Sequence, residues 1–302
     1  MRTRDRVCAV ALAVSVLGAC GTGATSPASG SKLSIVVAEN FWGSIVTQLA
    51  GDRADVTSII VNPATDPHAY EATAVDAREI ASARYVVYNG LGYDGWASNT
   101  LAASPSKDRK SLNVGDLLGL HVGDNPHQWY SPASVEKFIV RVTTDLQQLD
   151  SKDARYFTMR RQAFEATGLR EYRRLIATIV SRYAGVPVGA SESIFSPLAA
   201  ALHLDLLTPK AFVDAIAEGT EPSARDKATA DQQIKTHQIT VFVFNSQNAT
   251  PDVQRLVDEA RREHIAITTV TETLAPANLT FQAWQVRELA ALQHALASAT
   301  GR

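Results

Sequence analysis

Cysteine, excess positive charge and long apolar runs are all scarce in this sequence of 302 residues. The only two cysteines, Cys8 and Cys20, form neither a disulfide framework nor a cysteine-based zinc finger. Lys and Arg number 29 against 31 Asp and Glu, so there is no basic excess to neutralise nucleic-acid phosphates. A nucleic-acid partner is therefore not expected, and a metal site in this chain has to use His, Asp or Glu. The 45% hydrophobic content is enough for about two domains.

The N-terminus is predicted to be a lipoprotein signal peptide over residues 1–19. Three arginines among the first six residues precede an apolar run from Val7 to Gly18. This run is shorter than the roughly 20 residues that span a bilayer, and no later segment reaches that length. The tetrad LGAC at residues 17–20 resembles a lipobox, which predicts cleavage before Cys20 and a lipid anchor on Cys20. An ordinary signal peptide cleaved nearby is the alternative. Residues 20–32, rich in Gly, Ser, Thr, Ala and Pro, are expected to be a flexible tether.

From residue 33 onward, short β-branched runs alternate with amphipathic stretches, which predicts parallel sheets in two α/β lobes. In the first lobe we expect strands at 33–38, 56–61 and 85–88 and helices at 41–50 and 73–83. Residues 131–183 lack strand-like runs and predict a pair of helices, the second long. In the second lobe we expect a strand ending near 190, strands at 240–244 and 265–270, and helices at 194–202, 223–236, 252–263 and 280–299. The expected boundaries are 33–150 for the N-terminal lobe, 151–184 for a linking helix region and 185–302 for the C-terminal lobe.

Two of the seven histidines, His68 and His127, occupy unusual positions. Each follows a proline in a predicted loop, and the loop of His68 comes directly after a strand. The carboxyl ends of strands are where open α/β sheets present ligand groups, and proline reduces the freedom of the backbone before the imidazole. Two such histidines suggest a borderline transition metal held by imidazole nitrogen. Taken alone, a loop histidine more often caps a helix or completes a turn than binds a metal.

Carboxylates at other strand ends can balance the charge of a dication. Glu192 and Glu272 follow the strands that end near residues 190 and 270, at equivalent edges of the second lobe. Asn245 and Gln247 follow another strand and either orient these glutamates from behind or simply end the strand. The aromatic residues at 41 and 42, next to Asn40, are expected to pack in the core.

Three segments resemble the zinc- and manganese-type solute-binding lipoproteins of ABC importers: DPHAYEAT at 66–73, YNGLGYDGW at 88–96 and NPHQWYSP at 125–132. The resemblance extends from residue 33 to about residue 296 and agrees with the lipobox. It implies two Rossmann-like lobes with parallel sheets, joined by a long rigid helix, with one metal ion in the cleft between the lobes. By position, the implied ligands are His68 and His127 from the first lobe and Glu192 and Glu272 from the second. Many relatives have aspartate at the position of Glu272, and the histidine-rich loop of many zinc-binding relatives is reduced here to His121.

Two imidazoles and two carboxylates leave the choice between zinc and manganese open, and the same set can also bind iron. The resemblance implies an extracytoplasmic protein, monomeric and anchored by lipid, that delivers the ion to a permease driven by an ATPase. A surface adhesin or scaffold that uses the metal structurally is one alternative, and a metallohydrolase is another. Catalytic zinc normally keeps a position open for water beside three protein ligands, so four protein ligands argue against an enzyme. The remaining histidines, His203, His237, His264 and His294, are expected to take no part in binding.

Overall fold

The computed structural model describes residues 32–302. The predicted signal peptide, Cys20 and nearly all of the predicted tether lie outside the described residues. The strands are β1 Leu33–Glu39, β2 Ala54–Ile60, β3 Tyr85–Tyr88, β4 Lys110–Asn113, β5 Pro187–Ala190, β6 Asp205–Leu206, β7 Val241–Asn245 and β8 Ala266–Val270. The helices are α1 Asn40–Ala50, α2 Ala74–Ser82, α3 Gly95–Ala103, α4 Val114–Leu118, α5 Pro132–Leu149, α6 Ala154–Ala163, α7 Arg170–Tyr183, α8 Ser196–Ala201, α9 Lys210–Ala217, α10 Ala224–Lys235, α11 Pro251–Arg262 and α12 Phe281–Thr300.

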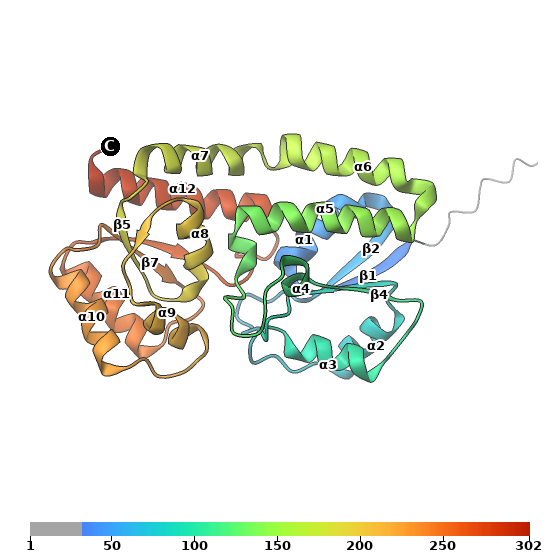
Figure 1. Cartoon of the computed structure of the whole chain (residues 1–302), viewed down its shortest axis with the longest axis horizontal. Coiled ribbons are helices and arrows are strands. Elements are labelled where there is room, and N and C mark those ends of the chain that lie inside the picture. Colours follow the sequence, from blue (N-terminus) through green and yellow to red (C-terminus); the bar gives the residue numbers. More distant parts are fainter. Residues whose placement is uncertain (1–31) are drawn as a thin grey trace, which may run out of the picture. The chain divides into compact units, whose positions relative to one another are not determined.

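The eight strands form two four-stranded parallel sheets with the same strand order. The first sheet has the order β2-β1-β3-β4, and the second has the order β6-β5-β7-β8. Figure 1 shows the two sheets in separate lobes with helices around each of them. The α/β fold class with two parallel-sheet lobes is confirmed, as are the strands and helices predicted outside residues 131–183, to within about two residues at most ends.

Helices cover both faces of the first sheet because its strands alternate between two apolar faces. Val36, Ala38 and Val86 pack with Ile80 of α2 and Trp96 of α3 in one cluster. The neighbouring β1 residues point the other way, into the main core, which also takes in α1 and α5. The second sheet is covered by α12 on one face and by α11 on the other (Figure 1).

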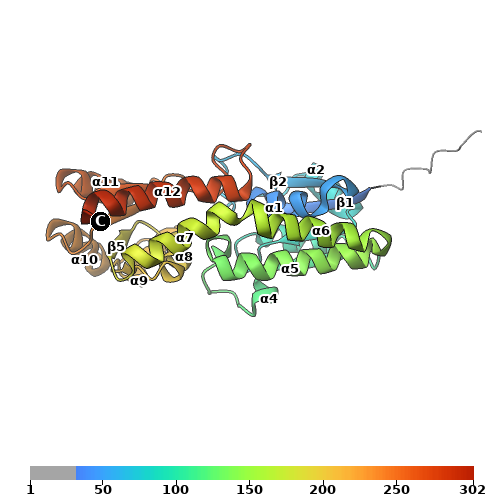
Figure 2. The same cartoon turned by 90° about the horizontal axis from the view of Figure 1, so that it is seen from above.

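The helices that join the lobes form a layer along one side of the molecule. α5 leads into α6, which continues through a π-helical turn at Phe164–Gly168 into α7. The last helix, α12, packs against α7 and also contacts α1 of the first lobe, as Figure 2 shows from above. The expected long second helix is therefore interrupted once by a π-helical turn. None of the helices between residues 32 and 302 has the length and hydropathy needed to cross a bilayer.

Start signals in the sequence explain where several helices begin. Thr73 and Asp76 form a capping box at the start of α2. Ser131 caps α5 and is followed by proline at the first helical position, and Thr280 caps α12. The cap of α5 matters for the site because it fixes the chain four residues after His127.

Three of the histidines expected to be uninvolved in binding have a local backbone role instead. His203, His237 and His264 have φ between 53° and 57°, in the left-handed region. Each follows the last turn of a helix and precedes the next strand or its approach. They therefore lie in the turns between elements, just after the helices predicted at 194–202, 223–236 and 252–263.

Candidate metal centre

The four side chains expected to bind metal all come from loops at the carboxyl ends of the strands. His68 follows β2, and His127 lies between α4 and α5 after β4. Glu192 follows β5 directly, and Glu272 follows β8. Because parallel strands all end at one edge of a sheet, the topology brings the two loops of each lobe to the edge that faces the other lobe.

The structure brings three of these side chains into one tight group. One nitrogen each from His68 and His127 and one oxygen from Glu272 lie within 4.8 Å of one another. The distance from His127 Nε2 to Glu272 Oε1 is 3.3 Å, and Glu192 Oε1 lies 4.0 Å from the same nitrogen. Ligand atoms around a tetrahedral zinc ion are about 3.4 Å apart, given the usual bond lengths. The His127–Glu272 pair matches that spacing, whereas Glu192 lies slightly outside it.

His127 is held with one ring nitrogen free to bind a cation. Its Nδ1 lies 2.9 Å from Asn125 Oδ1, and the amide of Asn125 donates to Ser193 O at 2.7 Å. Because that amide nitrogen is already used as a donor, Oδ1 accepts the Nδ1 proton and the lone pair is left on Nε2. His127 is completely buried, and its Nε2 has no hydrogen-bond partner among the described residues. Burial lowers the pKa of His127 to about 4, so the ring is neutral at pH 7.

Glu192 is buried and receives two amide hydrogen bonds. Asn245 Nδ2 donates to Glu192 Oε2 at 2.8 Å, and Asn248 Nδ2 donates to the same oxygen at 3.0 Å. Burial raises the pKa of Glu192 to about 8, and the nearby Glu272 carboxylate adds to this shift. In the absence of a cation the carboxyl group therefore holds a proton at pH 7, while its Oε1 faces His127.

Glu272 receives hydrogen bonds from both lobes. Tyr93 of the first lobe donates its hydroxyl to Glu272 Oε2 at 2.9 Å, and Asn245 Nδ2 of the second lobe lies 3.4 Å from Oε1. Burial raises the pKa of Glu272 as well. Two carboxyl groups and two neutral imidazoles meet here with no Lys or Arg among them, so a divalent cation is the charge that would satisfy all four.

His68 lies on the open side of the site. Its backbone nitrogen donates to Asp66 Oδ1 at 2.9 Å, and its ring packs edge-on against Tyr93 with ring centroids 4.5 Å apart. The side chain is solvent-exposed, but loss of water around the ring still lowers the pKa of His68, with Glu272 opposing the shift. This ring is also neutral at pH 7 and able to bind metal.

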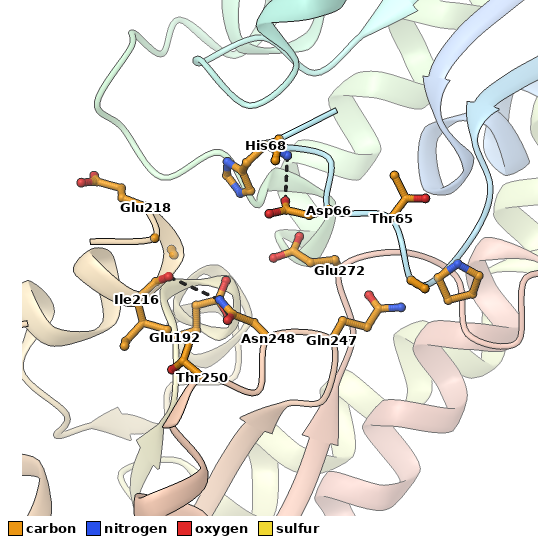
Figure 3. Close-up of a pocket in the computed structure, with 15 residues that line it drawn as sticks. Thr65, Asp66, His68, Glu192, Ile216, Glu218, Gln247, Asn248, Thr250 and Glu272 are labelled. Atoms are coloured by element: carbon orange, nitrogen blue, oxygen red, sulfur yellow. Dashed lines mark hydrogen bonds between the residues drawn. The ribbon is translucent and has the colours of Figure 1, made fainter. Parts of the chain in front are cut away.

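A cavity of about 500 Å³, lined by His68, Glu192 and Glu272, opens to solvent. Figure 3 shows His68, Glu192 and Glu272 on its wall, with Asp66 and Glu218 nearby. None of the described residues that line it is a lysine or an arginine. The cavity therefore gives cations a negatively charged route to the buried side chains.

Asn245 and Gln247, the two amides expected to orient the glutamates, make different contacts. Asn245 contacts both Glu192 and Glu272. Gln247 bonds instead to Thr273, whose backbone nitrogen donates to Gln247 Oε1 at 3.0 Å. Its contact is therefore with the loop that carries Glu272, not with either carboxylate.

Sequence reasoning missed three residues that hold the site: Tyr93, Asn125 and Asn248. The first two lie inside the segments that carried the family resemblance, so their positions were visible although their contacts were not. The third lies three residues beyond Asn245, and no local pattern marks it. The expectation of core packing is confirmed for the aromatic residues, because Phe41 stacks on Trp129 with ring centroids 3.9 Å apart.

Comparison with known proteins identifies the family of the chain. Residues 35–295 match the family model of the zinc-uptake complex component A, periplasmic. A manganese ABC transporter substrate-binding lipoprotein, PsaA, of Streptococcus mitis is 32% identical over 156 residues, covering 47% of this chain and 49% of that protein. The zinc-binding lipoprotein AdcA of Streptococcus pneumoniae is 25% identical over 239 residues, covering 72% of this chain and 46% of that protein. The chain spans about half the length of the curated relatives it matches.

Solved structures share the fold. The Mn-bound periplasmic metal binding protein from Candidatus Liberibacter asiaticus superposes with a TM-score of 0.70 at 19% identity. That match covers 88% of this chain and all of the other. The Cd-bound form of the same protein matches equally well, with a TM-score of 0.70.

Proposed function

Since the chain belongs to the family of the periplasmic zinc-uptake complex component A, we propose that it is the solute-binding component of an ABC importer and captures a divalent transition metal between its two lobes. The ligands in this proposal are His68 and His127 from the first lobe and Glu192 and Glu272 from the second. The lobes correspond to residues 33–150 and 185–302, and residues 151–184 link them.

The observation that carries the proposal is the unpaired nitrogen of His127. This buried Nε2 faces two carboxylate oxygens, at 3.3 and 4.0 Å, and its lone pair would repel them if no cation or proton lay between. A dication removes the repulsion, accepts the lone pair and is neutralised by the two carboxylates. Leaving such a group without a partner is costly, so the site is built to receive a cation.

The ion that we propose as cargo is zinc or manganese, and iron suits the same ligands. The imidazoles favour zinc, while two carboxylates that can bind through one or two oxygens suit the higher coordination of manganese. The 4.0 Å separation between His127 and Glu192 is wider than a tetrahedral edge, so binding of zinc requires Glu192 to move inward by about 0.6 Å.

The protein's own groups bind and release the ion and perform no covalent step. Asn125 fixes the ring of His127, Tyr93 and Asn245 hold the glutamates, and the acidic cavity admits the cation. We further propose that a permease and its ATPase accept the ion, that the chain acts as a monomer outside the cytoplasmic membrane, and that lipid on Cys20 anchors it there. We propose no enzymatic role.

The first test is metal content. The purified protein is stripped of metal, dialysed against equimolar zinc and manganese, and analysed by mass spectrometry together with His127→Ala. His294→Ala is the matched control, because this histidine is exposed on α12 away from the site. We expect one equivalent of metal in the wild type and in His294→Ala and none in His127→Ala. Equal metal content in all three proteins would refute the assignment.

A further inference from the structure

A buried hydrogen-bond network behind the metal centre joins the two lobes. The hydroxyl of Tyr130, in the first lobe, lies 2.6 Å from Glu288 Oε2 on α12. The same hydroxyl lies 2.9 Å from the carbonyl oxygen of Thr271 and accepts the Thr271 backbone N–H at 3.3 Å. One phenolic oxygen thus contacts both the backbone of the loop after β8 and the helix that supports this loop.

The second-lobe residues of this network are also hydrogen-bonded to one another. Thr271 Oγ1 lies 3.0 Å from Glu288 Oε1 and 2.9 Å from Thr273 O, and it accepts the indole N–H of Trp284 at 2.8 Å. Tyr130 and Trp284 are both completely buried, with ring centroids 5.5 Å apart. Hydrogen bonds in such a dry environment are stronger than surface ones, and each is costly to leave unmade.

The network sits next to one proposed ligand from each lobe. Tyr130 comes three residues after His127, and the two residues between them belong to a short 3₁₀ turn. Thr271 directly precedes Glu272. Tyr130 therefore links the backbones of the two loops whose ligand atoms, His127 Nε2 and Glu272 Oε1, are 3.3 Å apart.

We propose that Tyr130 is a positioning residue that fixes the separation of His127 from the glutamates of the second lobe, Glu192 and Glu272, and thereby determines how strongly the site discriminates between manganese and zinc. This inference rests on the metal-capture function proposed above. Zinc binds a given set of nitrogen and oxygen ligands more tightly than manganese, so a loose site collapses around zinc. His127 Nε2 already lies at the tetrahedral spacing from Glu272 Oε1 but 4.0 Å from Glu192 Oε1, so a site whose lobes are held at this separation resists contraction toward Glu192 and reduces the advantage of zinc.

The test is the dissociation constant for each metal, measured separately in the full chain by competition with a chelator of known affinity. Tyr130→Phe removes only the hydroxyl. Loss of a group that orients a metal ligand typically costs ten- to a hundredfold in affinity. We expect manganese affinity to fall by about that factor and zinc affinity to fall less than about threefold. Glu288→Gln tests the same contact from the other lobe and is expected to shift the ratio in the same direction.

Tyr172→Phe is the matched control. Tyr172 is also buried, on α7, but its hydroxyl has no hydrogen-bond partner among residues 32–302. This variant should leave both affinities unchanged. Thermal unfolding of each metal-free variant separates a change in selectivity from a loss of stability.

The outcomes are distinct. A manganese-to-zinc affinity ratio that falls in Tyr130→Phe and Glu288→Gln but not in Tyr172→Phe supports the inference. An equal loss for both metals, or no change in either variant, overturns it and leaves Tyr130 with a structural role only. If the wild type binds neither metal, the proposed function itself fails, and the inference fails with it.

Discussion

Metal binding should release a proton that comes from Glu192. Because burial raises the pKa of this carboxyl to about 8, it is mostly protonated at pH 7 in the metal-free protein. A carboxyl with that pKa carries about 0.9 proton at pH 7, and the proton must leave before the oxygen binds metal. Both histidines have lowered pKa values and are already neutral at pH 7, so they add little to the release.

The dependence on pH has a definite sign. Below pH 8 a proton competes with the ion for Glu192, so apparent affinity should rise almost tenfold for each pH unit between about 6 and 7.5. Above pH 8 the carboxyl is ionised without metal, and the curve should level off. At pH 9 the proton released from Glu192 should have fallen to about 0.1 per ion.

Isothermal titration with zinc in pairs of buffers that differ in ionisation enthalpy measures this release. Glu192→Gln should release about 0.9 fewer protons per bound ion than the wild type at pH 7. Glu288→Gln is the control, because burial also raises the pKa of Glu288 to about 8, but this carboxyl bonds to Tyr130 and Thr271 and does not face the ion. Equal proton release by the wild type and Glu192→Gln would refute the reasoning, as would a flat affinity between pH 6 and 8.

Four further outcomes are expected. Replacing His68 by Ala should lower metal affinity by several orders of magnitude in a competition assay, and near-wild-type binding would remove it from the ligand set. Tyr93→Phe, which deletes the hydroxyl that bonds Glu272 at 2.9 Å, should cost about ten- to a hundredfold in affinity, and an unchanged dissociation constant would contradict that role. Metal at a hundred times its dissociation constant should stabilise the folded wild type by about 2.7 kcal/mol, seen as a higher melting temperature that a chelator reverses. Burial raises the pKa of Glu39 well above its usual value. The protonated carboxyl therefore contributes to the free energy of unfolding below about pH 4.5, and this contribution is lost as the pH rises. The difference between the melting temperatures at pH 5 and pH 8 should accordingly be smaller in Glu39→Gln than in the wild type.

Local pattern was sufficient for most of the fold. The apolar runs of β1, β3 and β7 and the helical periodicity of α11 and α12 stand out because each element buries a continuous face. The two-residue strand β6 and the polar edge strand β4, with sequence KSLN, do not. Their pairing depends on the neighbouring strand and not on their own side chains, so no pattern in the sequence predicts them.

The candidate site likewise contains residues that the sequence predicts and contacts that it does not. Proline-histidine pairs after strands and glutamates at strand ends mark the candidate ligands because those signals are local. The contact from Tyr93 to Glu272 joins residues 179 positions apart, and the contact from Tyr130 to Glu288 joins residues 158 positions apart. Both depend on how the lobes pack against each other, which composition and periodicity do not determine.

Shared topology does not give the two lobes equivalent sites. If β5 to β8 are matched in turn to β1 to β4, Glu39 at the end of β1 corresponds to Glu192 after β5, and Asn89 after β3 corresponds to Asn245 at the end of β7. The same residue types therefore occur at the same strand ends, in different surroundings. Glu39 is completely buried, whereas Glu192 lines the cavity and accepts a hydrogen bond from Asn245. Only one lobe presents its glutamate to the cavity, so we expect a single metal centre between the lobes and a stoichiometry of one ion per chain.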